Sequence, residues 1–200
     1  MILHQIKYNT QRDNPNFSGR LPGSWQCFPT SAVMFLSHFD KSYETKEKEL
    51  EFIDDVQAGF GNPGIAEQVK GWFGISGEWW LVELAAIQKR IPTLNVIFDT
   101  ALSIDLLKTA IQTSPVIIGT RKIGGLKGGH IILVVGYDVN KDEFIVHDPY
   151  GNANKLYRDT NGAFVRLKSE YLKNHYNELA IYVGTRALGK DGGKPILKKK

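Results

Sequence analysis

The sequence predicts an α+β fold in which a helical first half packs against a twisted antiparallel β-sheet formed by the second half. Apolar residues recur at helical intervals in three segments before residue 92, whereas short runs rich in β-branched residues, separated by turn residues, follow residue 113. The 200 residues are 42% hydrophobic and 23% charged, which is typical of one globular domain. Helices and strands that are segregated along a chain pack as layers, so we expect a cleft where the two halves meet.

The expected elements follow in order along the chain. Residues 2–8 are expected to form a strand or an extended arm, and the polar stretch 9–24 a long loop. The next helix is expected to start just after Pro29, because proline is favoured in a first helical turn, and Cys27 then lies at or just before the N-terminus of that helix. Further helices are expected over 46–60, 77–91 and 104–113, and strands over 114–120, 130–138, 143–151, 163–167 and 179–185.

Positive charge is concentrated at the C-terminal end. The net charge is +4, residues 190–200 contain five lysines and one aspartate, and the rest of the chain has 20 basic and 20 acidic residues. Nucleic-acid binding needs cations arrayed over a folded surface, so we expect no nucleic-acid partner. We predict a domain over residues 1–187 and a flexible basic tail over 188–200, which aids solubility or is weakly attracted to anionic wall or membrane polymers.

The single cysteine, Cys27, excludes an intramolecular disulfide and indicates synthesis in a reducing compartment. The N-terminus lacks the basic start and apolar stretch of a signal peptide, and the longest apolar run, 131–135, is far too short for a transmembrane segment. We therefore expect a cytoplasmic protein at synthesis, which would reach the periplasm or cell wall only if another factor releases it.

Cys27 and His130 are the candidate nucleophile and general base. A thiol becomes a good nucleophile when its pKa is lowered, which the N-terminus of a helix and a nearby histidine both achieve. Cys27 has the first feature by its position, and His130 opens an expected strand directly after two glycines, which leave room for a substrate chain. We therefore expect the sheet half to present His130 to Cys27 across the cleft.

Asp148 is the candidate residue that orients His130. A catalytic imidazole needs a carboxylate or amide that accepts its other N–H. Asp148 ends the strand EFIVHDPYG, which is expected to pair with the His130 strand in a hairpin that turns between Asp138 and Asp142. Both side chains are then able to face the same cleft.

Four motifs in this order resemble the C39-like cysteine peptidases of the papain-like superfamily: QRDN, QCFPTSAVM, GGHIILVVGYD and FIVHDPYG. The resemblance covers about residues 5–185, with 103 positions from Cys27 to His130. It implies a papain-like fold with the active site between the two halves, and peptide-bond hydrolysis through a thioester without any cofactor.

In that superfamily a glutamine upstream of the cysteine completes the oxyanion hole. Gln11, in QRDN, is similar to that residue, although it lies 16 positions before Cys27, which is farther than in papain itself. Gln26 is the alternative, although a side chain directly next to Cys27 is expected to point elsewhere.

The other histidines and the tryptophans have simpler interpretations. His147 neighbours Asp148 on a strand and points to the opposite face, so we expect it to be packed or at the surface, and we predict no metal site. Aromatic residues at helical spacing are usually core, which we expect of Trp72 and Trp80. Trp25, beside the nucleophile, is the exception to test.

Three functions remain open at this point. The first is a monomeric peptidase or amidase that degrades peptidoglycan, of the phage endolysin kind. The second is a protease or isopeptidase acting on a protein, such as a leader peptide, a virion protein or a host protein. The third is a papain-like module that has lost catalysis and only binds, which the intact Cys27, His130 and Asp148 argue against.

Overall fold

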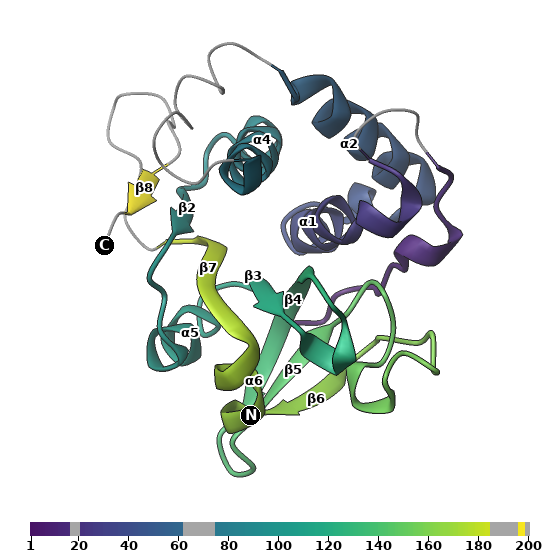
Figure 1. Cartoon of the computed structure of the whole chain (residues 1–200). Coiled ribbons are helices and arrows are strands. Elements are labelled where there is room, and N and C mark those ends of the chain that lie inside the picture. The colour runs from purple at the N-terminus through teal and green to yellow at the C-terminus, as the bar shows by residue number, and fades with distance from the viewer. Residues whose placement is uncertain (17–20, 62–74, 185–195, 199–200) are drawn as a thin grey trace.

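A computed structural model describes residues 1–16, 21–61, 75–184 and 196–198, and it has the expected α+β architecture (Figure 1). Its described helices are α1 (Cys27–Ser37), α2 (Lys46–Gly59), α4 (Ile75–Arg90), α5 (Ile104–Ala110) and α6 (Ser169–His175). Its strands are β1 (Ile2–Leu3), β2 (Val96–Asp99), β3 (Val116–Arg121), β4 (Gly129–Asp138), β5 (Glu143–His147), β6 (Val165–Lys168), β7 (Tyr176–Val183) and β8 (Ile196–Lys198).

The strands form one sheet in the order β6-β5-β4-β3-β7-β2-β8, and β1 pairs with β4 outside this path. The pairing of β2 with β8 is parallel, and the other pairings between described strands are antiparallel. The β4–β5 hairpin turns where the sequence predicts, with Asp138 opposite Glu143. The order places the strand that carries His130 in the interior of the sheet, between β3 and β5.

Local signals explain where the helices begin. Thr45 caps α2 by accepting a hydrogen bond from the backbone N–H of Lys48, and Ser103 caps α5 by accepting one from Leu106. Helix α1 begins at Cys27 itself, slightly earlier than the expected start after Pro29. The first-turn proline fits there because its missing N–H has no partner in an α-helix.

The sheet is covered on both faces, as its alternating residues require. Ile117 and Leu133 contribute to a core shared with α1, α2 and α4, which gather over one face in Figure 1. Their neighbours Ile118 and Val134 belong to a second core with α5 and α6 on the opposite face. Successive strand residues point to opposite faces, so one set of strands builds both cores.

Two elements were missed by the sequence analysis. The run VIFD forms β2 within the half that was expected to be helical, and it pairs with β7 at the far side of the sheet. Helix α6 follows β6 directly and returns the chain to β7. The stretch 9–24, expected to be a loop, contains two short 3-10 turns, at Gln11–Asp13 and Gly23–Trp25.

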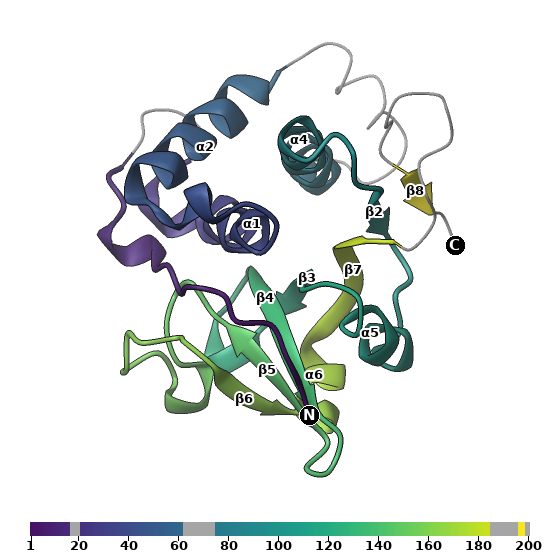
Figure 2. The same ribbon diagram turned by 180° about the vertical axis from the view of Figure 1, so that it is seen from behind.

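The two ends of the chain both contact the sheet. The N-terminal arm runs along β4, as Figure 2 shows from behind, and Ile2 lies opposite Tyr137. Most of the expected tail 188–200 lies outside the described residues; Ile196–Lys198 within it form β8, which differs from a tail without structure. No helix in the described ranges is long and apolar enough to cross a membrane.

Candidate active site

Cys27 is the first residue of α1, and its free thiol is half-buried. The first helical hydrogen bond runs from the N–H of Thr30 to the carbonyl of Gln26, so the N–H groups that precede Thr30 have no partner within the helix. These N–H groups and the helix dipole favour a negative charge on the sulfur. The thiol therefore lies at the N-terminus of a helix, as the sequence predicts.

The β4–β5 hairpin brings His130 and Asp148 together. His130 is the second residue of β4, and Asp148 follows the last residue of β5. The His130 Nε2 atom lies 2.7 Å from Asp148 Oδ1, and both side chains are buried. Cys27 and His130 line the same pocket, and since Nε2 is taken by Asp148, Nδ1 is the nitrogen left for the thiol. The structure therefore brings the three residues predicted to act together to one place.

Asp148 is held by more than the histidine. Its Oδ1 also accepts the backbone N–H of Tyr150 at 3.0 Å, and its Oδ2 accepts the hydroxyl of Tyr157 at 3.0 Å. The backbone N–H of Asp148 donates to the carbonyl of Gly162. A Cβ at position 162 would lie 1.9 Å from the Asp148 carbonyl oxygen, so only glycine permits this approach. The carboxylate therefore has a fixed position and orientation.

Opposing effects set the pKa of His130. Burial lowers it, but the negative charge of Asp148 and the hydrogen bonds to Asp148 and Cys27 raise it, and the net result is a pKa of about 10. His130 is therefore protonated at neutral pH.

The structure separates the two candidate glutamines. Gln11 is buried in the turn that packs against Gly23–Trp25, just ahead of Cys27, and its Nε2 donates to the carbonyl of Gly23 at 2.9 Å. Gln26 directs its Nε2 to the carbonyls of Pro15 and Leu21, into the loop that precedes the helix. Gln26 is thus occupied in holding that loop, whereas Gln11 lies beside the turn that leads to the nucleophile.

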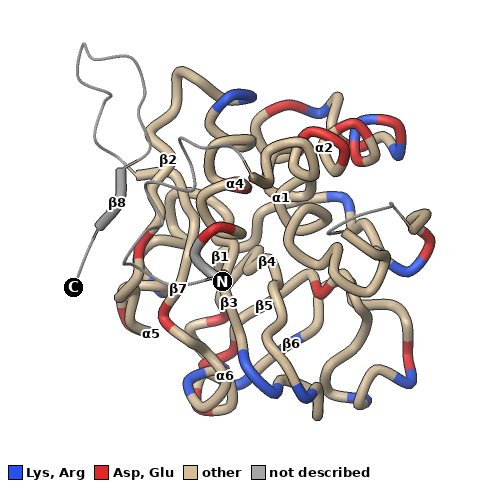
Figure 3. Tube along the Cα trace, turned by 45° about the horizontal axis from the view of Figure 1, so that its top comes forward, with Lys and Arg blue, Asp and Glu red and all other residues tan. Residues whose placement is uncertain are grey.

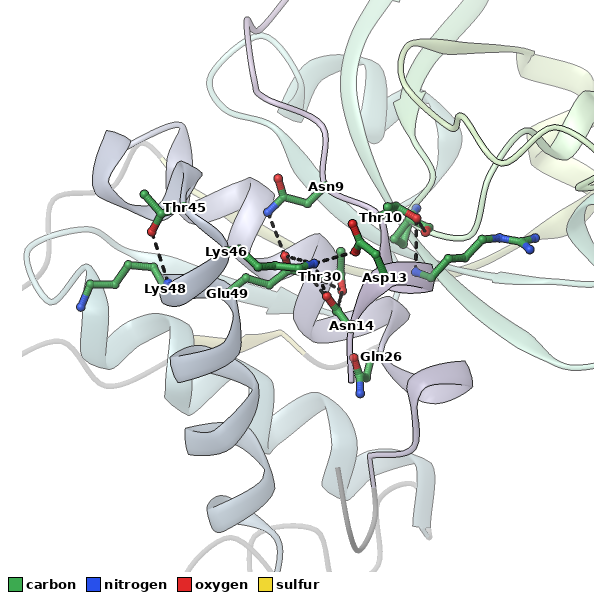
Figure 4. A network of polar contacts seen from close by, with 12 residues as sticks. Asn9, Thr10, Asp13, Asn14, Gln26, Thr30, Thr45, Lys46, Lys48 and Glu49 are labelled. Atoms are coloured by element: carbon green, nitrogen blue, oxygen red, sulfur yellow. Dashed lines mark hydrogen bonds and ion pairs between the residues drawn. The ribbon is translucent and has the colours of Figure 1, made fainter. Parts of the chain in front are cut away.

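The segment that carries Gln11 is fixed from two sides. On the sheet side, the backbone N–H of Gln11 and the hydroxyl of Thr10 both donate to the carbonyl of Pro149, next to Asp148. On the helix side, Glu49 of α2 is buried and accepts hydrogen bonds from four side chains, as Figure 4 shows: Asn9, Asn14, Thr30 and Lys46. Segment 9–14 therefore links the two halves of the molecule beside the active site.

Glu83 is a second buried glutamate, and its surroundings are different. It lies in α4 with none of its surface exposed, and neither carboxylate oxygen has a hydrogen-bond partner. Burial raises the pKa of Glu83 well above its usual value, the charge of Cys27 raises it further, and Arg90 lowers it. The protonated form of Glu83 is therefore favoured, and its carboxyl group lies within electrostatic range of the nucleophile.

A pocket with a cavity volume of about 820 Å³ opens over Cys27 and His130. The helical half contributes its aromatic residues, and the sheet half contributes a strand end and loop with three cations. The lining includes Trp25, Phe28, Trp79, Trp80, Arg121, Lys122, Lys127, Gly128, Gly129, Asn177 and Leu179. The two glycines predicted to leave room for substrate do lie at the pocket surface.

The remaining histidine and tryptophan predictions have clear outcomes. His147 is fully buried and packed, as one of the two expected alternatives. Its Nε2 donates to the carbonyl of Ile6, and its Nδ1 accepts the N–H of Phe164. Burial lowers the pKa of His147 to about 4. Trp80 is core, Trp25 is 57% exposed at the pocket, and Trp72 lies outside the described residues. The part of the chain that the structure describes contains no cluster of three metal-ligating side chains.

Sequence reasoning missed Tyr157 and Glu83. Tyr157 lies in an irregular loop after Leu156, and both residues have left-handed backbone angles, so no periodic pattern marks them. Glu83 occupies an amphipathic helix on which a glutamate is ordinarily solvated. Its position four residues after Trp79 and three after Trp80 was the available signal, because those spacings share a helix face.

Comparisons with known proteins agree with this geometry. The sequence model of the Peptidase_C39 like family matches residues 3–180. No curated protein matches the chain. A crystal structure of a protein from Bacillus anthracis described as a C39-like peptidase shares the fold, with a TM-score of 0.59 and 16% identity over 94% of this chain and 98% of that one.

A second solved structure is a double glycine motif protease from an AMS/PCAT transporter in complex with its leader peptide. It has a TM-score of 0.51 and 14% identity over 91% of this chain and 93% of that one. At these identities the likeness to both structures concerns the fold, while the family is given by the match over residues 3–180. The chain therefore belongs to the Peptidase_C39 like family, and it is a cysteine peptidase with a papain-like fold.

Proposed function

We propose that the protein hydrolyses peptide bonds in an extended peptide or protein segment, with Cys27 as nucleophile, His130 as general acid and base, and Asp148 as the residue that orients His130. The observation that carries this proposal is the contact of Asp148 with His130 at 2.7 Å, beside the pocket that His130 lines together with Cys27. The open pocket above the same atoms supports it.

The proposed reaction has two halves. The thiolate of Cys27 attacks the carbonyl carbon, and the resulting oxyanion collapses as the C–N bond breaks and His130 gives its proton to the leaving amine. Neutral His130 then takes a proton from water, whose oxygen attacks the thioester carbon. The carboxylic acid product leaves, and the thiolate of Cys27 and the imidazolium of His130 are restored.

The oxyanion formed in each half needs donors. We assign this role to the backbone N–H of Cys27 and the side chain of Gln11, because the Gln11 amide lies against the turn that precedes Cys27. Its Nε2 donates to Gly23 in the resting enzyme, and it would turn from that carbonyl toward the oxyanion when substrate binds. The side chain of Gln26 instead donates to the carbonyls of Pro15 and Leu21.

The peptide part of peptidoglycan is a second candidate substrate. Its stem peptides carry free carboxylates, which would be attracted by Arg121, Lys122 and Lys127 at the pocket.

One experiment separates these functions from a module that only binds. A peptide library prepared from a digested proteome, and purified peptidoglycan, are each incubated with the wild type and with Cys27→Ala, and products are identified by mass spectrometry. Peptide cleavage that disappears in Cys27→Ala supports the proposal. If peptidoglycan alone is cleaved, the second candidate, a peptidase that acts on the peptides of peptidoglycan, is the function. If neither substrate gives a product that depends on Cys27, the peptidase proposal is rejected.

A further inference from the structure

The cations at the active-site pocket differ from those on the rest of the molecule. Arg121, Lys122 and Lys127 are all exposed and line the pocket, and no aspartate or glutamate is among the described residues that line it. Elsewhere the two signs are interspersed, as along α2 in Figure 3, and the chain without residues 190–200 has equal numbers of acidic and basic residues. The pocket therefore has a local positive charge on an otherwise balanced body.

Among the described residues, these three cations have no acidic partner. Within the described ranges, none of them forms an ion pair, whereas many other cations do, such as Lys46 with Glu49 and Arg166 with Asp138. A cation without a protein partner keeps its full attraction for an anion that binds beside it. The charge at the pocket is therefore available to a substrate.

The backbone that presents the cations is well anchored. Arg121 lies opposite Gly129 in the β3–β4 pairing, and the N–H of Lys122 donates to the carbonyl of Gly128, which closes the loop between them. Inside the loop Ile123 is fully buried, and the N–H of Gly124 donates to the hydroxyl of Tyr171. The cations thus emerge from a fixed frame directly beside His130.

The helical half lines the same pocket with aromatic side chains. Trp25 and Trp79 lie with ring centroids 5.9 Å apart, and Trp25 is 57% exposed two residues before the nucleophile. A peptide that lies extended between the two halves presents alternate side chains to opposite sides. One set of side chains would contact the aromatic side, and the next would face the cations.

From this arrangement we infer that the peptidase prefers substrates with an aspartate or glutamate close to the cleaved bond, recognised by Arg121, Lys122 and Lys127 opposite an apolar side chain held by Trp25. The inference rests on the proposed peptidase function and adds the substrate class to it. Because the three cations are solvent-exposed, their contribution depends on ionic strength.

The test uses the full chain and cleavage-site profiling. The wild type, a rim variant with Arg121→Gln, Lys122→Gln and Lys127→Gln, and a control variant with Lys41→Gln, Lys141→Gln and Lys173→Gln digest the same proteome-derived peptide library. Both variants lose three positive charges, but the residues of the control do not line the pocket. A peptide pair that differs only by glutamate or glutamine at the preferred position then gives kcat/KM.

We expect the wild type and the control to enrich acidic residues within about four positions of the cleaved bond, and to prefer the glutamate peptide by about tenfold at low salt. The preference should shrink in 0.5 M NaCl and fall to about twofold or less in the rim variant. Cleavage without any acidic preference, or a preference that the rim variant retains, overturns the inference and leaves the peptidase function standing. If no peptide is cleaved at all, both fail.

Discussion

Tyr157 donates its hydroxyl to Oδ2 of Asp148 at 3.0 Å, while the other oxygen of that carboxylate binds His130. This hydrogen bond links a loop residue to Asp148, whose carboxylate is fully buried, so both of its oxygens have partners. It fixes the plane of the carboxylate, and through it the ring of His130.

Tyr157→Phe should therefore weaken catalysis without removing it. The variant keeps the ring but deletes the hydrogen bond to Asp148, so we expect kcat to fall by about tenfold or less and the free energy of unfolding by about 1 kcal/mol. Steady-state kinetics and urea unfolding provide the two values. An unchanged kcat would show that the His130 contact alone suffices to orient Asp148.

Asp148→Asn should move the alkaline limit of activity. The charge of Asp148 holds the pKa of His130 up at about 10 against the lowering effect of burial, so the neutral amide should let that pKa fall. His130 then loses its proton at lower pH, and the alkaline limb of kcat/KM should move down by about one pH unit or more. Tyr157→Phe is the matched control, because it keeps the charge and should leave the position of the limb unchanged.

The two glutamines provide a test of the oxyanion assignment. Gln11→Ala should lower kcat by about 10² to 10³ with a small change in KM, as expected for a donor that acts in the transition state. Gln26→Ala should instead lower stability, because it releases the carbonyls of Pro15 and Leu21, and leave the kcat of the folded fraction nearly unchanged. If Gln26→Ala lowers kcat and Gln11→Ala does not, the oxyanion role belongs to Gln26.

Glu83 and Glu49 are both buried, but their replacement by glutamine should affect the free energy of unfolding differently. Glu49→Gln weakens an ion pair with Lys46 and three side-chain hydrogen bonds, so stability should fall by about 1–3 kcal/mol. Glu83 has no hydrogen-bond partner and is neutral when folded, so Glu83→Gln should cost little at pH 4.

The raised pKa of Glu83 determines how the stability of the folded protein changes with pH. Its pKa is raised above the usual 4.5 in the folded protein, so above pH 4.5 the unfolded chain releases the proton that the folded protein retains. The wild type is therefore destabilised as pH rises through this range, while Glu83→Gln is not. Urea unfolding should show that the free energy of unfolding of Glu83→Gln, relative to the wild type, is higher at pH 8 than at pH 4. The same difference at both pH values would mean that Glu83 ionises normally.

The sequence predicts the central features of this enzyme because they are encoded locally. A helix start at Cys27, a strand start at His130 and a two-stranded turn between Asp138 and Asp142 each leave a short-range pattern, and the order of the motifs indicates the family. In the structure His130 lies 2.7 Å from Asp148 and lines one pocket with Cys27, while their catalytic roles stay predictions.

The features that the sequence did not predict arise from long-range packing. The contact of Tyr157 with Asp148 depends on a loop with left-handed residues, and the burial of Glu83 depends on how α4 lies against α1. Strand β2 is short and preceded by a long helical stretch, so its run of four residues resembles a helix end until β7 pairs with it. For the Tyr157 contact and the β2–β7 pairing, no periodicity or spacing in the sequence gives a signal, whereas Glu83 shares a helix face with Trp79 and Trp80.

The most direct test of the account is the rate at which Cys27 reacts with iodoacetamide at pH 6. An ordinary thiol, with a pKa of about 8.5, is almost wholly protonated there and reacts slowly, so a fast reaction at this pH reports an activated nucleophile. We predict that wild-type Cys27 is alkylated at least about tenfold faster than glutathione, and that His130→Ala removes this advantage. A wild-type rate equal to that of glutathione, or one unaffected by His130→Ala, would contradict the central claim that His130 activates Cys27.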